Sequence, residues 1–247
     1  MPSVVRVAVI SDIHANLHAF RAVLDDVERA APDELWCLGD TVGYGPRPNE
    51  CCELVRARAA VCLLGNHDLA SLGELDLATF ARDAALAALW TADALDASAR
   101  TFLTGLEPSA ERAGVPLYHG SAREPVWEYV LSEQAALATL DDAQAPLVLV
   151  GHSHIALAFG FDGNAVIEAG VARAGTEREL AEGRWLLNPG SVGQPRDGDP
   201  RAAWVLLDLE RRFAEFRRVP YPVEQTQTEL RQAGLPAALA DRLSHGN

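Results

Sequence analysis

The sequence predicts an α/β (α+β) fold in which two facing mixed β-sheets are flanked by helices. Strand and helix patterns alternate over about the first 65 residues, as is typical of a parallel sheet with crossover helices. An Ala- and Leu-rich stretch without strand character follows, and short strands separated by turns fill most of the second half. Because the sequence contains neither linker-like composition nor internal repeats, residues 1–247 are predicted to form one domain.

The alternating part has the order strand, helix, strand, helix, strand. Residues 4–10, 35–38 and 61–64 are short runs rich in β-branched or aliphatic residues and are predicted to be buried strands. Asn16 is the predicted N-cap of the first helix, which has one apolar face. That face consists of Leu17, Phe20, Val23, Leu24 and Val27. Pro48 suits the first turn of the second helix.

A helical insertion is predicted at about residues 69–113, where Ala and Leu are frequent. It would serve either as a cap over one edge of a functional site or as a packing surface that forms a homo-oligomer. Beyond it, strand patterns return, and the second half is predicted to be antiparallel. The segments are 115–118, 147–150, 155–161, 164–167, 185–187, 202–209 and 213–219, with 162–163 as a hairpin turn. The tail from Pro222 is predicted to be helical, with a break at 234–236.

The composition excludes several classes of protein. A formal net charge of −14 disfavours nonspecific nucleic-acid binding, because the phosphate backbone would be repelled. A small phosphorylated substrate stays compatible, since a local cationic cluster can reverse the field inside a cleft. The first residues lack the features of a secretory signal, and no run approaches the ~18 apolar residues of a membrane span. Four cysteines without CxxC spacing suggest free thiols in a reducing compartment, so we expect a cytoplasmic protein.

Polar side chains able to bind metal follow five of the predicted strands, at the point where each strand ends. The groups are Asp12 and His14, Asp40, Asn66 and His67, His119, and His152 and His154. Five of the seven histidines are among them, and only His18 and His245 lie elsewhere. Any one histidine is most simply a satisfied core residue, and residues 66–68 alone are most simply a polar turn. Neither explanation accounts for five such groups at strand ends, where open α/β sheets place their ligands.

These residue types indicate which metals the site would hold. Two carboxylates, several imidazoles and an amide oxygen, without thiolates, suit Mn, Fe, Ni, Co or Zn. Six or seven ligands exceed one tetrahedral site and suit two divalent ions that share a carboxylate. The 24 residues between His14 and Gly39, and again between Asp40 and Gly65, fit a crossover helix plus a strand, so each crossover returns the next group to the same edge. Two such ions can generate a hydroxide nucleophile and hold the oxygens of a displacement at phosphorus.

The ordered motifs resemble those of the calcineurin-like metallophosphoesterase superfamily. They are DIH at 12–14, GD at 39–40, GNHD at 65–68, HGS at 119–121 and GHSH at 151–154. Their co-occurrence in this order is far more specific than any single motif, and the resemblance covers residues 5 to about 207. The segments GDTVGYGPRPNE, WEYVL and LNPGSVGQPRDGDPRAAW further resemble a bacterial and archaeal branch of predicted phosphodiesterases. The resemblance implies a four-layer sandwich and a hydrolase of phosphate esters.

The resemblance also implies a role for each matching residue. The first ion would be held by Asp12, His14 and His154, the second by Asn66, His119 and His152, and Asp40 would bridge them. His67 would not be a ligand but would protonate the leaving oxygen as general acid. Asp68 is expected to be a structural hydrogen-bond partner rather than a catalytic residue.

The chain departs from the pattern of the superfamily's serine/threonine protein phosphatases. Those enzymes carry Asp-Arg-Gly after the loop of the bridging aspartate, and that Asp orients the general-acid histidine. Here the same place reads Val42-Gly43-Tyr44-Gly45. The change removes an arginine that grips phosphate and leaves the residue that orients His67 unassigned. A protein phosphatase is therefore not expected.

Two later residues are candidates for substrate binding. Asn188 and Arg196 lie in a turn-rich segment, and a guanidinium group matches phosphate oxygens bidentately. The alternative for Arg196 is an ion pair with Asp197 or Asp199, and the alternative for Asn188 is a structural position in the loop.

Three residues after His119 are further candidates. Arg123, Trp127 and Tyr129 would either line a pocket, where an aromatic ring could stack on a nucleobase, or be ordinary core or interface residues. His18, one helical turn after His14, is expected to be solvated.

The function predicted from these observations is a dinuclear metal-dependent phosphoesterase that hydrolyses a phosphodiester or nucleotide-like substrate through metal-activated water. The preference for a diester rests on the resemblance and on the missing arginine. A phosphomonoesterase or dinucleoside polyphosphate hydrolase on the same centre is one alternative. A non-catalytic interaction scaffold, as in the retromer subunit with this fold, is the other. The scaffold is disfavoured because His67 and every ligand residue are present.

Overall fold

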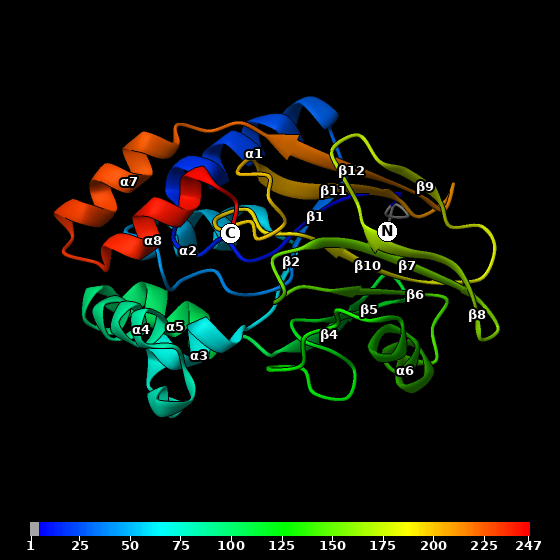
Figure 1. Cartoon of the computed structure of the whole chain (residues 1–247), viewed down its shortest axis with the longest axis horizontal. Helices are drawn as coiled ribbons and strands as arrows, with labels where there is room; N and C mark the ends of the chain where they lie inside the picture. Colours follow the sequence, from blue (N-terminus) through cyan, green and yellow to red (C-terminus); the bar gives the residue numbers. More distant parts are fainter. Residues whose placement is uncertain (1–4) are drawn as a thin grey trace.

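The computed structural model describes residues 5–247 and contains two six-stranded mixed sheets that face each other (Figure 1). The first sheet has the order β3 (Val61–Cys62), β2 (Glu34–Cys37), β1 (Arg6–Ile10), β11 (Ala202–Asp208), β12 (Phe213–Val219) and β9 (Glu177–Glu179). The second sheet has the order β4 (Ser109–Arg112), β5 (Val115–Tyr118), β6 (Leu147–Val150), β10 (Arg184–Pro189), β7 (Ala156–Asp162) and β8 (Ala165–Val171). The predicted fold class is confirmed. Val4, which the sequence places in the first strand, lies outside the described residues.

Helices flank the two sheets, and several of them gather at one end of the molecule (Figure 1). They are α1 (Leu17–Ala30), α2 (Pro48–Arg58), α3 (Asn66–Leu72), α4 (Arg82–Ala94), α5 (Ala97–Thr104), α6 (Glu133–Ala143), α7 (Val223–Gln232) and α8 (Ala237–Asp241), with 3-10 turns at Leu77–Thr79 and Arg242–Ser244. Asn16 caps α1 by accepting a hydrogen bond from the Ala19 amide, and Pro48 begins α2, both as predicted. Within residues 5–247, no helix combines the length and the apolar character that crossing a membrane requires.

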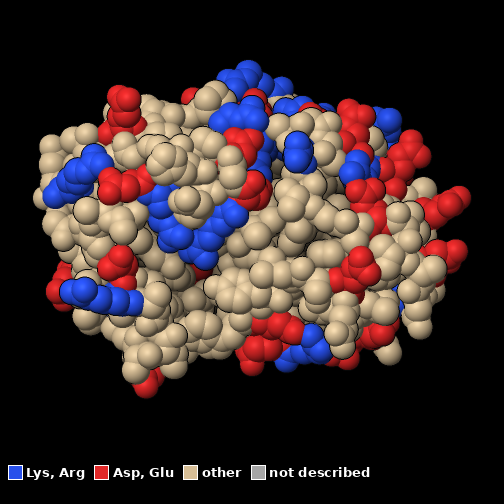
Figure 2. Space-filling view, in the orientation of Figure 1, with Lys and Arg blue, Asp and Glu red and all other residues tan. Residues whose placement is uncertain are grey.

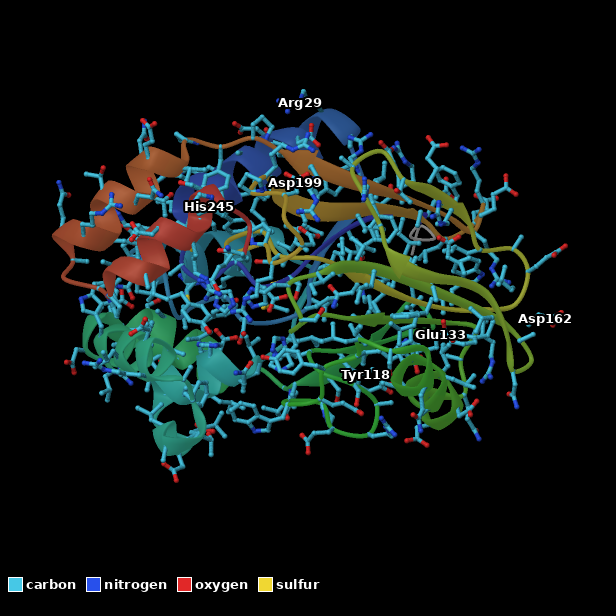
Figure 3. The ribbon with its side chains drawn as sticks, viewed as in Figure 1. Arg29, Tyr118, Glu133, Asp162, Asp199 and His245 are labelled. Atoms are coloured by element: carbon cyan, nitrogen blue, oxygen red, sulfur yellow. The ribbon has the colours of Figure 1, made fainter. Side chains whose placement is uncertain are left out.

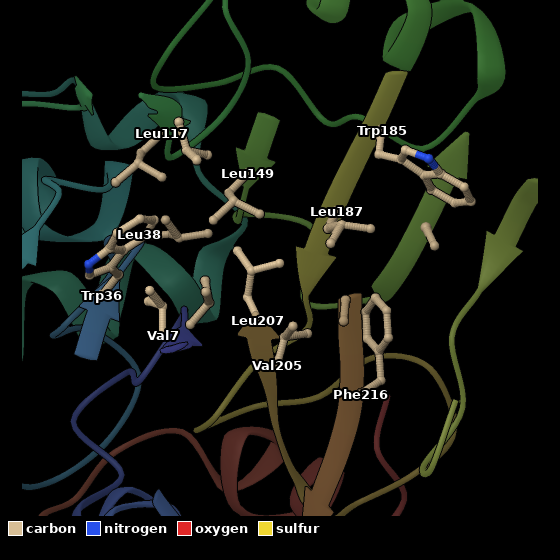
Figure 4. Close-up of a cluster of buried hydrophobic side chains, with 14 of the residues drawn as sticks. Val7, Trp36, Leu38, Leu117, Leu149, Trp185, Leu187, Val205, Leu207 and Phe216 are labelled. Atoms are coloured by element: carbon tan, nitrogen blue, oxygen red, sulfur yellow. The ribbon is translucent and has the colours of Figure 1, made fainter. Parts of the chain in front are cut away.

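The first strand shows why its sequence is apolar at every position. Val7 and Val9 of β1 pack between the two sheets, whereas Ala8 and Ile10 belong to the cluster beneath α1. All four side chains are fully buried. A strand covered on both faces has no solvent side, so its sequence is a continuous hydrophobic run. The inter-sheet cluster also contains Leu38, Leu117, Leu149, Leu187, Val205 and Leu207 (Figure 4).

The topology corrects the prediction that the second half is antiparallel. β1, β2 and β3 are parallel neighbours, as the alternating pattern predicts. In the second sheet, β5, β6 and β10 are parallel neighbours as well. A parallel pair needs a long crossover, and the one between β5 and β6 contains α6, which the sequence pattern did not reveal. Antiparallel pairing holds for β7 with β8 and for β11 with β12.

The predicted insertion at 69–113 is wrong at its C-terminal end. Its last part forms β4, which pairs antiparallel with β5 across a two-residue turn. Ala113 and Gly114 have φ values of 51° and 76°, the pair of positive angles found in a type I′ hairpin turn. Because β4 contains no β-branched residue, its composition does not mark it as a strand. The hairpin turn predicted at 162–163 lies one residue later, since Asp162 still pairs with Ala165.

The insertion packs against the C-terminal helices at one end of the molecule (Figure 1). One hydrophobic cluster joins α4 to α7 and α8 through Ala87 and Leu230 and includes Tyr44. On α4, Leu86 and Leu89 are 44% and 53% exposed. The insertion therefore has an inner face against the rest of the chain and an outer face with exposed leucines.

Candidate metal centre

Loops that follow β1, β2, β5 and β6 bring the predicted metal-binding side chains together. They form two overlapping groups whose potential ligand atoms lie within 4.8 Å of one another. The first group is Asp12, His14, Asp40 and His154, and the second is Asp40, His119 and His152. Asp40 Oδ2 lies 3.6 Å from both His14 Nε2 and His119 Nε2. A single carboxylate therefore connects the two groups.

Five of these residues adopt a backbone conformation that side chains other than glycine rarely take. Their φ values are 55° for Asp12, 49° for His14, 51° for Asp40, 64° for His152 and 59° for His154. Each such residue costs roughly 1–3 kcal/mol, and strain of this kind gathers at functional sites. Hydrogen bonds between the loops maintain this strained backbone. The Asp12 amide donates to Gly39 O at 3.0 Å, and the His14 amide donates to Asp40 O at 2.9 Å.

Each of the four imidazoles in the two groups uses one ring nitrogen on a backbone carbonyl. The bonds run from His14 Nδ1 to Val42 O at 3.1 Å, from His119 Nδ1 to Leu38 O at 2.9 Å, from His154 Nδ1 to Gln194 O at 2.7 Å and from His152 Nε2 to Trp127 O at 3.1 Å. A carbonyl oxygen only accepts, so these nitrogens carry the protons and the other nitrogen of each ring presents a lone pair. Metal-ligating histidines are held in this way.

The unprotonated ring nitrogens lie next to other hydrogen-bond acceptors, not next to donors. His14 Nε2 lies 3.0 Å from His154 Nε2. His119 Nε2 lies 3.1 Å from Asn66 Oδ1, which places the predicted amide ligand beside the second group. Two acceptors in contact repel each other unless a positive charge lies next to both. The histidine and amide geometry therefore favours cations.

The two carboxylates are poorly satisfied by the protein alone. Both oxygens of Asp12 and Oδ2 of Asp40 are buried without a hydrogen-bond partner in residues 5–247. Burial raises the pKa of Asp12 to about 7, and burial together with the neighbouring Asp68 carboxylate holds the pKa of Asp40 well above its usual range. Burial also lowers the pKa of His14 and of His154 well below the usual range. Divalent cations would favour both the carboxylates and the neutral imidazoles, so the residues present fit such ions.

The family model of the calcineurin-like phosphoesterase superfamily domain matches residues 5–212. The chain belongs to this superfamily. It is 36% identical over 247 residues to an uncharacterised protein of Methanocaldococcus jannaschii, an alignment covering 97% of this chain and 98% of the relative. A crystal structure of a metallophosphoesterase from Sphaerobacter thermophilus is 40% identical, with a TM-score of 0.88 and coverage of 99% of this chain and 100% of that chain.

A shorter similarity concerns a named enzyme. Over 63 residues the chain is 41% identical to the symmetrical bis(5'-nucleosyl)-tetraphosphatase of Erwinia tasmaniensis. That alignment spans 24% of this chain and 23% of that protein.

Membership in the calcineurin-like superfamily implies a phosphoesterase hydrolase, and its members typically bind divalent metals. The clustered Asp and His side chains agree with that property. The resemblance drawn from the ordered motifs is therefore confirmed, and so is the metal-binding character expected of the chain.

In this phosphoesterase, His67 is enclosed by rings. The ring centroids of Tyr44, His14 and Phe80 lie 4.2, 5.0 and 5.4 Å from that of His67. Gly43 is also close, because a Cβ there would lie 2.8 Å from the His67 Cβ. The residue that orients His67 could not be assigned from the sequence, and ring packing gives this task to Tyr44 and Phe80. A bulky aromatic between two glycines was the signal available for Tyr44.

The start of α3 ties His67 to the shared carboxylate. Asp68 accepts hydrogen bonds from the Gly65 and Val42 amides, each at 2.9 Å, which confirms its expected structural role. The His67 amide donates to Asp40 Oδ1 at 2.8 Å. A Cβ at Gly65 would lie 2.0 Å from the same oxygen, so only glycine fits this close approach.

Arg196 lies beside the cluster. Its Nη2 donates to Gln194 Oε1 at 2.8 Å and to the Tyr44 hydroxyl at 3.3 Å, while its Nε is buried without a partner in residues 5–247. Burial, followed by the positive charge of Arg196, lowers the pKa of His67 to about 3. The negative charge of a bound phosphate would offset that of Arg196 and favour protonation of His67.

The expected alternative for Arg196, an ion pair with Asp197 or Asp199, is wrong. Asp197 instead pairs with Arg218, and both of these side chains are buried. Asp199 pairs with Arg201 at 2.6 Å. The guanidinium of Arg196 therefore has no carboxylate partner among residues 5–247.

Asn188 has a structural position in the fold, and its contact with substrate stays a prediction. It is fully buried. Its Nδ2 donates to Gly151 O at 2.6 Å and to Ser153 Oγ at 3.0 Å, and its Oδ1 accepts from the Gly190 amide at 2.9 Å. Both donors and the acceptor of the amide are used, so Asn188 braces the turn that carries two of the histidines.

Trp127 and Tyr129 border the site. The Trp127 ring packs against Phe80 with centroids 5.1 Å apart, and its carbonyl accepts from a site histidine. Tyr129 stacks on His152 at 4.0 Å with an interplanar angle of 16° and is 48% exposed. Arg123 instead pairs with a glutamate of the same loop.

The two histidines outside the motifs lie outside the cluster. His18 Nε2 lies 3.2 Å from Glu229 Oε1, so it contacts α7 and is not simply solvated as expected. His245 follows α8 near the C-terminus (Figure 3).

Proposed function

We propose that this chain is a dinuclear metal-dependent phosphoesterase that hydrolyses a phosphodiester or nucleotide-like substrate. The observation that carries the proposal is the position of Asp40, whose Oδ2 lies 3.6 Å from a histidine nitrogen of each ligand group. A carboxylate shared by two sets of ligands is what a pair of closely spaced ions requires.

Seven residues would hold the two ions. Asp12, His14 and His154 would bind the first, Asn66, His119 and His152 the second, and Asp40 both. Oxygen and nitrogen ligands without thiolate suit Mn, Fe, Ni, Co or Zn, with manganese as the first metal to test. Bound there, the ions would activate water as a nucleophile at neutral pH and offset the charge of the phosphate.

The remaining polar groups would act on the substrate. His67 contacts the His14 ring yet belongs to neither ligand group, so it is free to protonate the leaving oxygen. The phosphate itself would raise the low pKa of His67 as it binds. Arg196, without a carboxylate partner, would hold the non-bridging phosphate oxygens through charge-assisted hydrogen bonds.

A phosphomonoesterase or dinucleoside polyphosphate hydrolase on the same centre is the second candidate. It is favoured by the similarity to the symmetrical bis(5'-nucleosyl)-tetraphosphatase, although that match spans only 23% of the relative. The diester assignment rests on the loop after Asp40, where Tyr44 lies in place of the phosphate-gripping arginine of the protein phosphatases. A scaffold without activity is the least supported, because the ligand residues and His67 are all present and clustered.

A substrate and metal panel tests the proposal. The purified protein is assayed on p-nitrophenyl phosphate and bis(p-nitrophenyl) phosphate with each of the five metals. We expect metal-dependent turnover that is faster on the diester. Turnover of the monoester alone would favour the second candidate. Absence of turnover on both esters and on a dinucleoside tetraphosphate with every metal would refute a hydrolytic function.

A cytoplasmic location and a homo-oligomeric state are further predictions for this chain. Free cysteines, of which Cys37, Cys51 and Cys52 are buried, support a reducing compartment. Exposed Leu86 and Leu89 on α4 support association through the insertion. Light scattering of the wild type and of Leu89→Glu would test the latter, and a monomeric wild type would contradict it.

A further inference from the structure

A groove runs outward from Tyr44 between the insertion and the C-terminal helix. Its volume is about 550 Å³. One wall is the start of α4, with Arg82 and Asp83. The other wall consists of Leu239 of α8 and of Arg242, which directly follows the end of α8. The volume falls in the range of small-molecule sites.

At its inner end, the groove is lined by a residue that packs against the proposed catalytic centre. Tyr44 lines the groove, and its ring lies 4.2 Å from that of His67 and 4.7 Å from that of His14. Phe80 packs on His67 at 5.4 Å and directly precedes Ala81, which also lines the groove. The groove therefore begins beside the residue that would protonate the leaving oxygen. The leaving portion of a substrate would extend into it.

Two guanidinium groups meet near this inner end. Gln194 Oε1 accepts from Arg196 Nη2 at 2.8 Å and from Arg242 Nη1 at 3.2 Å. Neither arginine makes an ion pair with an Asp or Glu of residues 5–247, and Arg242 Nε donates to Asn247 O at 2.6 Å. Burial and the nearby Arg196 charge lower the pKa of Arg242. Like charges held together by one amide oxygen would be relieved by an anion between them.

A third guanidinium lies on the opposite wall. Arg82 is exposed and makes neither an ion pair nor a side-chain hydrogen bond with the described part of the chain. Among residues 5–247, Asp83 is the one acidic residue that lines the groove. Figure 2 shows basic side chains gathered on this face, where α8 and the C-terminus lie in Figure 1. In a chain with a net charge of −14, a gathering of arginines that have no Asp or Glu partner in residues 5–247 indicates an anionic ligand.

We infer that the groove binds a second phosphate group, carried by the leaving portion of the substrate. This inference rests on the proposed function and narrows it to substrates with at least two phosphate groups. Arg196 would hold the phosphate that is attacked, while Arg242 and Arg82 would hold the second one. The planar donors of arginine match phosphate oxygens in pairs, and a neutral or aromatic leaving group would leave these charges unused.

Two substrates that differ in phosphate number test the inference in the metal-loaded protein. Bis(p-nitrophenyl) phosphate has one phosphate, and diadenosine tetraphosphate has four. In Arg82→Gln and in Arg242→Gln, we expect the ratio of kcat/KM for the tetraphosphate to that for the single-phosphate ester to fall about tenfold. Arg29→Gln, an exposed arginine of α1 (Figure 3), is the matched control and should keep the wild-type ratio. A ratio within twofold of wild type in both groove variants would overturn the inference.

A binding measurement tests the role of the groove independently of hydrolysis. Calorimetry compares adenosine 3',5'-bisphosphate with adenosine 5'-monophosphate, a pair that differs by one phosphate. We expect the bisphosphate to bind about tenfold more tightly to the wild type, and this preference to be lost in Arg82→Gln and Arg242→Gln. If no ester is hydrolysed but the preference for the bisphosphate depends on these arginines, the proposed hydrolytic function is refuted and phosphate binding in the groove is supported. If esters are hydrolysed while the wild type shows no preference, the groove assignment falls and hydrolysis stands.

Discussion

The Nε2 atoms of His14 and His154 lie 3.0 Å apart, although each ring already donates its Nδ1 hydrogen to a backbone carbonyl. Neither Nε2 carries a proton, so the contact places two lone pairs together. The two residues are 140 positions apart in the sequence. The second half of the chain therefore completes a candidate cation site to which the loop after the first strand contributes, and the consequences can be measured.

Divalent metal should stabilise the protein strongly. Metal at about 100 times its Kd adds about 2.7 kcal/mol to the free energy of unfolding, which raises Tm by roughly 5–10 °C in a chain of this length. Scanning fluorimetry with manganese and with a chelator measures the shift. His154→Ala should lose most of it, and His245→Ala, whose ring lies outside both ligand groups, should retain it. Equal shifts in the two variants would contradict the assignment of the cluster.

Asp40→Asn should empty or disorder the metal pair. Its Oδ2 is the oxygen near histidines of both groups, and an amide is a much weaker bridge than a carboxylate. Elemental analysis of the protein after dialysis should give about two ions per chain in the wild type and fewer than one in the variant. Normal metal content in Asp40→Asn would show that this carboxylate does not bridge.

His67→Ala should keep both metals and lose about 10²- to 10⁴-fold in kcat, the usual contribution of a general acid. The loss should be smallest for a good leaving group such as p-nitrophenolate and largest for an alkoxide, which needs the proton. Kinetics on a series of diesters with graded leaving groups measures the trend. Full activity on the poorest leaving group would remove His67 from the reaction.

Gly43→Ala should impair catalysis through the packing of His67. Gly43 and Gly73 have almost the same φ, 85° and 83°, so alanine strains the backbone similarly at both. Only at Gly43 would the new Cβ meet a side chain, 2.8 Å from the His67 Cβ. At Gly73, apart from its chain neighbours and its own helix, no atom of residues 5–247 would lie within 4 Å. We expect Gly73→Ala to lose about 1 kcal/mol of stability and Gly43→Ala somewhat more, and Gly43→Ala alone to lose at least tenfold in kcat with its metal content unchanged. Equal kcat values in the two variants would show that the contact does not position the ring.

Arg196→Gln should weaken substrate binding without releasing metal. A hydrogen bond to a charged group contributes about 1.5–3 kcal/mol, so KM should rise roughly 10- to 100-fold. Arg201→Gln is the matched control, because that arginine is held by Asp199 at 2.6 Å. Steady-state kinetics on the diester compares the two. A KM for Arg196→Gln equal to that of the control would place the substrate phosphate elsewhere.

Much of the candidate metal centre could be predicted because its residues share one kind of position, directly after a buried strand. Asp12, Asp40 and His152 each follow a run of apolar residues that forms a buried strand, and β1, β2 and β6 are all parallel to a neighbour. A crossover connection returns the parallel strands β1 and β2 to the same edge of the first sheet, which brings Asp12 and Asp40 together. The end of β6 belongs to the second sheet and reaches them because the two sheets pack face to face. The prediction failed at β4 and α6, whose composition carries no signal as strong as the apolar runs.

Other features could not be read from local patterns. The sequence allows Arg196 either to bind a phosphate or to form an ion pair with an adjacent aspartate. The structure shows that those aspartates pair with Arg218 and Arg201 instead. The sequence offers Asn188 as a substrate contact, and the fold adds three hydrogen bonds by which it braces the turn that carries His152 and His154. Such choices depend on which partners arrive from elsewhere in the fold.

By itself, the sequence determined the fold class, the superfamily and the grouping of candidate ligands at strand ends, because apolar periodicity and short motifs are local properties that survive in one dimension. Only the tertiary structure decided how His67 is held, through Tyr44 and Phe80, and which arginines stay unpaired. Tyr44 and Arg196 meet across 152 positions of the chain. Contacts of that separation form when whole elements pack, so no local pattern specifies them.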